Sequence, residues 1–306
     1  MKIDYFCLGL KLVELQSFFV NQSFMLKYKK EFLGEFLGTF ILVLFGCGSV
    51  FVSVLFNEYH GIFQVAMVWG IGVTLAIYLT RHLSCAHLNP AVSIAMVISK
   101  RMVSRKLPVY IFSQFMGAFA AGLVLYVLFS SSIVSYESSH GIIRGSEESA
   151  KVAKMFGEYY TLPGSTSFVT LPLAMGAEAF GTFILLLMIF ALSEGCNVGR
   201  PDNTITPIFI GLTVTSIICL IAPLTQAGLN PARDFGPRLV AWMAGWGKAA
   251  FPDHTGGFFF VYILAPIVGG SIASWFFVKV LEPSMKSTST GCGCMENESS
   301  ENTKNK

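Results

Sequence analysis

The chain has 306 residues, of which 53% are hydrophobic and only 13% are charged. A soluble protein usually has about 25% charged residues, and a chain this apolar would expose large hydrophobic patches in water. The net charge of +3 comes with no block of basic residues, which argues against nucleic-acid binding. The 7 cysteines form no CxxC pair and show no spacing typical of a zinc site. We therefore expect a polytopic membrane protein with no metal and no other cofactor.

Six apolar stretches predict six transmembrane helices, since a helix needs about 20 apolar residues to cross the hydrocarbon core of a bilayer. The stretches are Phe32–Phe56, Ile62–Thr80, Leu107–Ser130, Leu171–Leu192, Ile205–Ala222 and Gly257–Val278. Residues 1–31 are expected to be an N-terminal tail and not a cleavable signal, because Lys11 and Glu14 interrupt their apolar positions. Residues 281–306 are rich in Ser, Thr, Glu and Asn and predict a disordered C-terminal tail.

The distribution of Lys and Arg predicts the orientation of the chain in the membrane. One side of the membrane holds 15 of the 21 Lys and Arg residues and consists of residues 1–31, 81–106, 193–204 and 279–306. The segments 131–170 and 224–257 on the other side hold the remaining 6. Because positive residues concentrate on the cytoplasmic side, we expect both termini in the cytoplasm. We expect the membrane to be the plasma membrane.

Two further apolar stretches, Leu88–Ile98 and Leu229–Met243, are too short to span the bilayer and are expected to be re-entrant segments. Each begins with the same tripeptide, which consists of Asn89, Pro90 and Ala91 in the first and of Asn230, Pro231 and Ala232 in the second. Proline is suited to the first turn of a helix, and asparagine directly before it is a strong N-cap. Each tripeptide therefore predicts the start of a half-helix whose positive dipole end lies at membrane depth.

The two halves of the chain are related by an internal duplication. EFLGTFILVLFGCGS begins at Glu35 and EAFGTFILLLMIFALS begins at Glu178, an offset of 143 residues. The two Asn-Pro-Ala motifs are offset by 141 residues, as are Gly70 and Gly211. An odd number of spans per half places the second half inverted in the membrane. Paired short segments in inverted halves indicate a pore or binding site near the midplane.

The sequences SCAHLNPAVSIAM and LTQAGLNPARDFGPR resemble the two signature loops of the aquaporins, which form the major intrinsic protein family. Asp234, the segments HGIIRGS and AWMAGWG, and the long 131–170 loop resemble its glycerol-conducting branch, the aquaglyceroporins. The resemblance implies an all-α channel domain over residues 32–280, with repeat halves of about 32–130 and 171–280. It implies six transmembrane helices and two re-entrant half-helices in a right-handed bundle.

The resemblance also implies roles for individual residues. Asn89 and Asn230 would donate to a permeating hydroxyl at the centre of the pore. The backbone carbonyls that accept from it would belong to Cys85, Ala86, His87, Leu88, Gly228 and Leu229. The selectivity filter would consist of Trp69, Ile218, Ala227 and Arg233. The residues that support the loops would be Glu35, Glu178 and Asp234, and a proton relay is the less favoured interpretation of the two glutamates.

Two filter positions depart from the pattern of glycerol channels. Counted back from Arg233 without gaps, Ile218 falls where these channels usually carry Gly, and Ala227 falls where they carry an aromatic residue. Ile218 adds bulk to one wall of the filter, and Ala227 removes bulk from another. We expect the two changes to compensate, so that the filter stays wide enough for glycerol. The ranking of water, glycerol, urea and other small neutral solutes stays open at this point.

The sequence therefore predicts a passive channel for glycerol and water in the lipid bilayer, which excludes ions and protons and assembles as a homotetramer. Two alternatives stay open. The first is a water-restricted channel, in which Ile218 narrows the filter, and the second is a secondary transporter, which uses the same inverted-repeat architecture. No GxSxG or HExxH motif occurs, so we expect no enzymatic activity.

Overall fold

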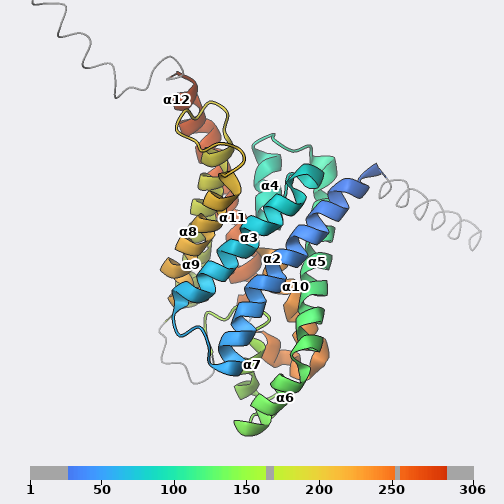
Figure 1. The fold of residues 1–306 in the computed structure, drawn as a ribbon. Helices are drawn as coiled ribbons and strands as arrows, with labels where there is room; N and C mark the ends of the chain where they lie inside the picture. The colour runs from blue at the N-terminus through green and yellow to red at the C-terminus, as the bar shows by residue number, and fades with distance from the viewer. Residues whose placement is uncertain (1–26, 163–168, 252–255, 288–306) are drawn as a thin grey trace, which may run out of the picture.

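The computed structural model describes residues 27–162, 169–251 and 256–287, and within these ranges the chain folds into helices and turns without a strand (Figure 1). Six helical segments in these ranges are long and apolar enough to cross a membrane. Five of them are α2 (Lys29–Phe56), α3 (Ile62–Ser84), α5 (Leu107–Leu128, preceded by the turn Ser104–Lys106), α8 (Leu171–Ser193) and α9 (Thr206–Thr225). The predicted all-α membrane fold with six spanning helices is confirmed.

The sixth spanning segment, Phe259–Lys286, is longer than the predicted stretch. It consists of the π-type turns Phe259–Leu264, then α11 (Ala265–Phe276), the π-type turns Phe277–Leu281 and α12 (Glu282–Ser287). The start of the predicted C-terminal tail is therefore helical up to Ser287, and Lys286 forms an ion pair of 2.6 Å with Glu282 one turn earlier. The rest of that tail, 288–306, lies outside the described residues, as does most of the predicted N-terminal tail.

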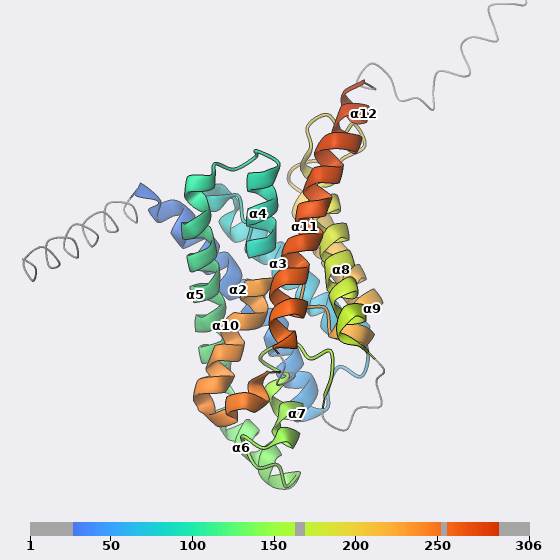
Figure 2. The ribbon, with the colours of Figure 1, turned by 180° about the vertical axis from the view of Figure 1, so that it is seen from behind.

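The two Asn-Pro-Ala motifs begin the half-helices α4 (Pro90–Ile98) and α10 (Pro231–Ala241). Figure 2 shows α4 in the upper half of the bundle and α10 in the lower half, both between α5 and α11. Their N-terminal ends meet, because each N-cap asparagine donates a hydrogen bond to the loop that precedes the other half-helix. Neither half-helix crosses the bundle, as the sequence predicts.

Gly70 and Gly211, which share the repeat offset, lie at the crossing of α3 and α9. A Cβ atom on Gly70 would lie 2.6 Å from the carbonyl oxygen of Gly211, and a Cβ on Gly211 would lie 2.3 Å from that of Gly70. Only glycine permits so close an approach of two backbones. The duplicated glycines therefore allow the two halves of the repeat to pack closely at this crossing.

The segment expected to be a long loop over 131–170 contains two helices, α6 (Ser130–Ser139) and α7 (Ala150–Ala153), with a short turn, Glu147–Ser149, between them. Its apolar residues explain the difference, since Ile133, Met155 and Phe156 are buried against the bundle. Phe156 packs edge-on against Phe51, with ring centroids 4.8 Å apart. A further turn region, Trp242–Ala250, follows α10 at the same end of the molecule (Figure 2).

Candidate functional site

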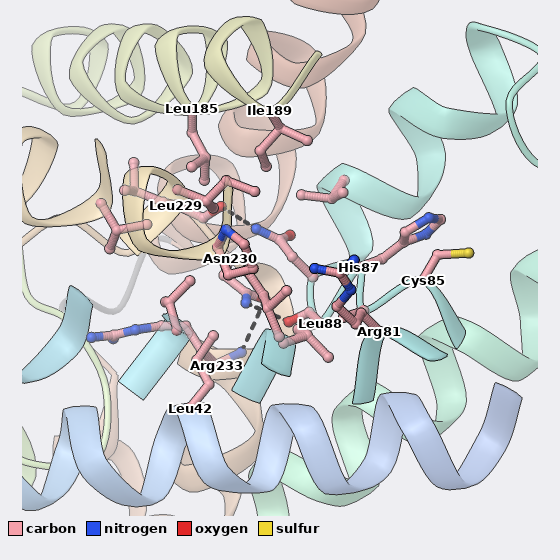
Figure 3. A pocket seen from close by; sticks show the side chains of 18 of the residues that line it. Leu42, Arg81, Cys85, His87, Leu88, Leu185, Ile189, Leu229, Asn230 and Arg233 are labelled. Carbon is pink, nitrogen blue, oxygen red and sulfur yellow. Dashed lines mark hydrogen bonds between the residues drawn. The ribbon is translucent and has the colours of Figure 1, made fainter. Parts of the chain in front are cut away.

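A cavity of about 380 Å³ runs between the helices and reaches both Asn-Pro-Ala motifs (Figure 3). One wall is an apolar stripe with helical spacing along three helices. It consists of Trp69, Val73 and Ile77 on α3, Leu185 and Ile189 on α8, and Ile210, Val214 and Ile218 on α9. The loops before α4 and α10 form a polar wall, and Leu42, Val92 and Met96 line the cavity from α2 and α4. The cavity therefore offers both hydrocarbon side chains and polar backbone.

The polar wall has an unusual backbone conformation. Cys85, Ala86 and Leu88 have positive φ angles of 66°, 53° and 55°. The residues 141 positions later, Gln226, Ala227 and Leu229, have φ angles of 65°, 64° and 56°. Left-handed backbone is costly for residues other than glycine and tends to occur at functional sites. Both loops are therefore non-helical in the same way, which leaves their carbonyl groups outside any helical hydrogen-bond ladder.

The two N-cap asparagines link the halves of the repeat. The Asn89 side-chain oxygen accepts from the backbone N–H of Ala91 at 2.8 Å, and its amide nitrogen donates to the carbonyl oxygen of Leu229 at 2.9 Å. Asn230 accepts from Ala232 at 3.0 Å and donates to Leu88 at 2.8 Å. An asparagine amide carries two N–H donors, so each residue keeps one donor beyond its bond to the other loop. Both side chains line the cavity.

Each loop is fixed by a fully buried glutamate of its own half. The Glu35 carboxylate accepts from the backbone N–H groups of His87 at 2.9 Å and Leu88 at 2.7 Å, and from the Gln114 side chain at 2.7 Å. The Glu178 carboxylate accepts from Gly228 at 2.8 Å and Leu229 at 2.7 Å. It also accepts from the Thr225 hydroxyl at 2.6 Å. Neither glutamate lines the cavity.

Arg233 closes one end of the cavity against Trp69. Its guanidinium carbon lies 4.1 Å from the centre of the Trp69 ring, and its side chain is only 4% exposed. Nη2 forms an ion pair with the Glu158 carboxylate, whereas Nη1 has no hydrogen-bond partner among the described residues. A buried donor without a partner is costly unless a ligand or water satisfies it. Arg233, which lines this end of the cavity, therefore keeps a buried donor without a partner in the part of the chain that the structure describes.

Glu158 lies behind Arg233 and is held in place by α10 and by the residue that follows α9. Its backbone N–H donates to Asp234 at 2.7 Å, and its carbonyl oxygen accepts from Arg238 at 2.7 Å. The next N–H, of Tyr159, donates to the Gln226 side chain at 2.8 Å. Burial raises the pKa of the Glu158 carboxyl, although the charge of Arg233 acts in the opposite direction. Asp234 thus binds Glu158 and Arg238 and does not itself line the cavity.

The predicted site residues fall into two groups in the structure. The first group lines the cavity and consists of Trp69, Cys85, Ala86, His87, Leu88, Asn89, Ile218, Ala227, Gly228, Leu229, Asn230 and Arg233. The second group lies behind it and consists of Glu35, Pro90, Ala91, Glu178, Pro231, Ala232 and Asp234. His87 lines the cavity and also contacts a residue behind it. Its Nδ1 atom lies 3.2 Å from the Ser93 hydroxyl oxygen.

The other end of the cavity carries two arginines that sequence reasoning did not assign to the site, Arg81 and Arg101. Arg81 lies twelve residues beyond Trp69 on α3, about 18 Å along the helix axis. Its guanidinium donates to the backbone carbonyl of Asn203 at 2.6 Å. Arg101 forms ion pairs with Glu194 and Glu282. We call this end the Arg101 mouth and the other the Arg233 filter.

Comparison with known proteins agrees with this geometry. A family model described as "Major intrinsic protein" matches residues 22–277. The glycerol uptake facilitator protein of Pseudomonas aeruginosa is 40% identical over 246 residues, which cover 79% of this chain and 85% of that protein. The propanediol uptake facilitator of Citrobacter freundii is 40% identical over 79% of this chain and 88% of its own length. The chain therefore belongs to the major intrinsic protein family and is a multi-pass membrane protein.

A solved structure shows the same arrangement. The X-ray structure of the aquaglyceroporin from Plasmodium falciparum superposes with a TM-score of 0.72 and is 29% identical. The match covers 85% of this chain and 99% of that one. The resemblance to the aquaporin family is confirmed.

Proposed function

We propose that the chain is a passive channel that conducts glycerol and water, and excludes ions and protons. The observation that carries the proposal is the cavity, which is lined by an apolar stripe and by two polar loops, with Arg233 at its end. Glycerol has a hydrocarbon backbone on one side and hydroxyl groups on the other. Its carbons fit against Trp69, and its hydroxyls fit the loop carbonyls, the asparagine amides and the buried donor of Arg233. Two of the related proteins are named for the uptake of glycerol and propanediol.

Ion exclusion follows from the same parts of the cavity. The positive ends of α4 and α10 meet near the two asparagines, and a helix N-terminus opposes cations. The charge of Arg233 adds to this field, although the neighbouring Glu158 reduces it. The neutral hydroxyl solute meets no such barrier. The proposed filter of Trp69, Ile218, Ala227 and Arg233 then sorts neutral solutes by size.

The setting of the channel follows from the sequence. We place both termini and the Arg101 mouth in the cytoplasm and the Arg233 filter outside, in the plasma membrane. Large apolar side chains on α3 and α9 are exposed, including Ile71, Leu75, Phe209 and Leu212. Such a surface fits contact with lipid or with neighbouring copies. The proposal of a homotetramer with one pore in each chain rests on the resemblance to the family.

Stopped-flow light scattering on proteoliposomes tests the proposal. Gradients of water, glycerol, 1,2-propanediol and urea are applied in turn to vesicles with and without the protein. We expect glycerol and water to enter protein-containing vesicles faster than empty ones. Glycerol entry at the rate of empty vesicles, with rapid water entry, would establish the water-restricted channel in place of the glycerol channel.

A further inference from the structure

The Arg101 mouth contains a charge cluster that the conduction mechanism above does not use. The Arg101 side chain lines the cavity and is 26% exposed. Glu194 and Glu282 both pair with its Nη2 atom, the second at 3.4 Å. Two carboxylates from distant parts of the chain thus converge on a single guanidinium beside the path of the solute.

The backbone of Arg101 is held by the end of α4. Lys100 has a φ of 60°, and its N–H donates to the carbonyl of Val97 at 3.0 Å. The N–H of Arg101 donates to the carbonyl of Met96 at 2.8 Å. This pair of bonds with a left-handed residue is the Schellman motif that ends many helices. The Cα atom of Arg101 is therefore fixed to the half-helix, and only its long side chain is free to change position.

The present position of that side chain depends on two other segments. Glu194 directly follows α8, and Glu282 is the first residue of α12. The guanidinium carbon also lies 5.0 Å from the Phe190 ring and 5.3 Å from the Phe277 ring. Ser193 lines the same cavity, and its hydroxyl oxygen offers an acceptor to a guanidinium that leaves the two carboxylates. The side chains of the Arg101 pairs are partly exposed, whereas those of the Arg233 pair are almost fully buried, so the Arg101 pairs are the weaker ones and the alternative position is accessible.

We propose that Arg101 is the gate of the cytoplasmic mouth. Glu194 and Glu282 hold its guanidinium against the wall and keep the mouth open, and its release places the guanidinium across the path of the solute. The inference rests on the proposed conduction pathway. Because Glu282 begins α12, the position of the C-terminal segment sets the state of the mouth. Displacement of α12 from Arg101 therefore reduces the flux.

A set of variants separates gating from damage to the fold. Glu194→Gln with Glu282→Gln releases Arg101, and the triple variant adds Arg101→Ala to remove the released group. The matched control is Glu31→Gln, which breaks a different cytoplasmic ion pair, of 2.7 Å to Lys106, between side chains of similar exposure outside the cavity. Stopped-flow measurement in proteoliposomes gives the glycerol and water flux per amount of inserted protein.

We expect the flux of the double variant to be about threefold to tenfold lower than that of the wild type, which is the range that two weak ion pairs can control. The triple variant should recover that flux, and the control should match the wild type. A double variant with wild-type flux overturns the proposal, and so does a triple variant as slow as the double, since the loss then comes from structural damage. If the wild type conducts water but no glycerol, the proposed glycerol function fails. The water flux of the same variants then still tests whether Arg101 is a gate.

Discussion

The cavity has an arginine paired with carboxylate at each end, but the two ends differ in burial. Arg233 and Glu158 have side-chain exposures of 4% and 7%, whereas Arg101 is 26% exposed and its two partners 13% and 17%. Breaking a buried ion pair leaves an unpaired charge away from water and costs about 3–5 kcal/mol. An exposed pair contributes about 0.2–1 kcal/mol. We therefore expect Arg233 to be fixed at the proposed filter and Arg101 to be adjustable at the other end.

The largest expected effect is on solute selection at the filter. Ala227→Phe places an aromatic ring in the wall of the cavity, where Ile218 already takes up space. Since one methylene in a filter that fits its solute is worth about 1–3 kcal/mol, glycerol flux should fall by roughly 10- to 200-fold or more. Water flux in the same vesicles should fall less. Unchanged glycerol flux would mean that Ala227 does not form part of the constriction.

The second prediction compares the stability of the two ion pairs. Arg233→Val leaves Glu158 buried without its partner and should reduce the free energy of unfolding by about 3–5 kcal/mol. Arg233→Val combined with Glu158→Gln should recover much of this loss. Arg101→Ala should cost about 1 kcal/mol or less. Thermal unfolding in detergent measures all three, and equal losses at the two ends would contradict the distinction between a fixed and an adjustable end.

The third prediction concerns pH. Burial raises the pKa of the Glu158 carboxyl, so this group takes up a proton at a higher pH than an exposed glutamate does. Protonation removes the charge that fixes Arg233 in the proposed filter, and glycerol flux should therefore fall as the pH on the outer side is lowered. Glu158→Gln carries no titratable group and should show low flux without this pH dependence. A pH profile of Glu158→Gln identical to that of the wild type would show that another group titrates.

The smallest expected effect is that of salt. The pairs at the Arg101 mouth are partly exposed and are screened when the Debye length shortens to about 3 Å near 1 M salt. Flux through the wild type should fall by less than about threefold in matched high-salt buffers on both sides of the membrane. The triple variant that lacks Arg101, Glu194 and Glu282 charges should not respond. Equal salt sensitivity of both proteins would place the effect elsewhere in the channel.

The features predicted correctly from the sequence are those whose cause is local. Asn-Pro starts a half-helix wherever it occurs at membrane depth, so α4 and α10 begin at the predicted prolines. Apolar length predicts the spanning helices to within a few residues at most ends. The helix around Glu282 extends further than composition predicts, because charged residues continue a helix once it has left the hydrocarbon core.

The features that the sequence does not reveal depend on distant partners. Glu158 lies 75 residues before Arg233, within a segment whose composition is typical of a loop, and nothing near it indicates an ion pair. Arg101 lies in the 81–106 segment, whose basic residues predict the orientation of the chain, while its partners Glu194 and Glu282 follow much later in the chain. The bonds from Asn89 and Asn230 to the loop of the other half likewise arise only when the two inverted halves are brought together.

The measurement that tests the central claim most directly is the equilibrium distribution of labelled glycerol across proteoliposomes, with and without an imposed proton or sodium gradient. A passive channel cannot accumulate its solute, so the final concentration inside should equal that outside under every condition, and no ionic current should accompany entry. Accumulation of glycerol against its gradient, or entry that requires the proton or sodium gradient, would contradict the channel and establish a coupled transporter.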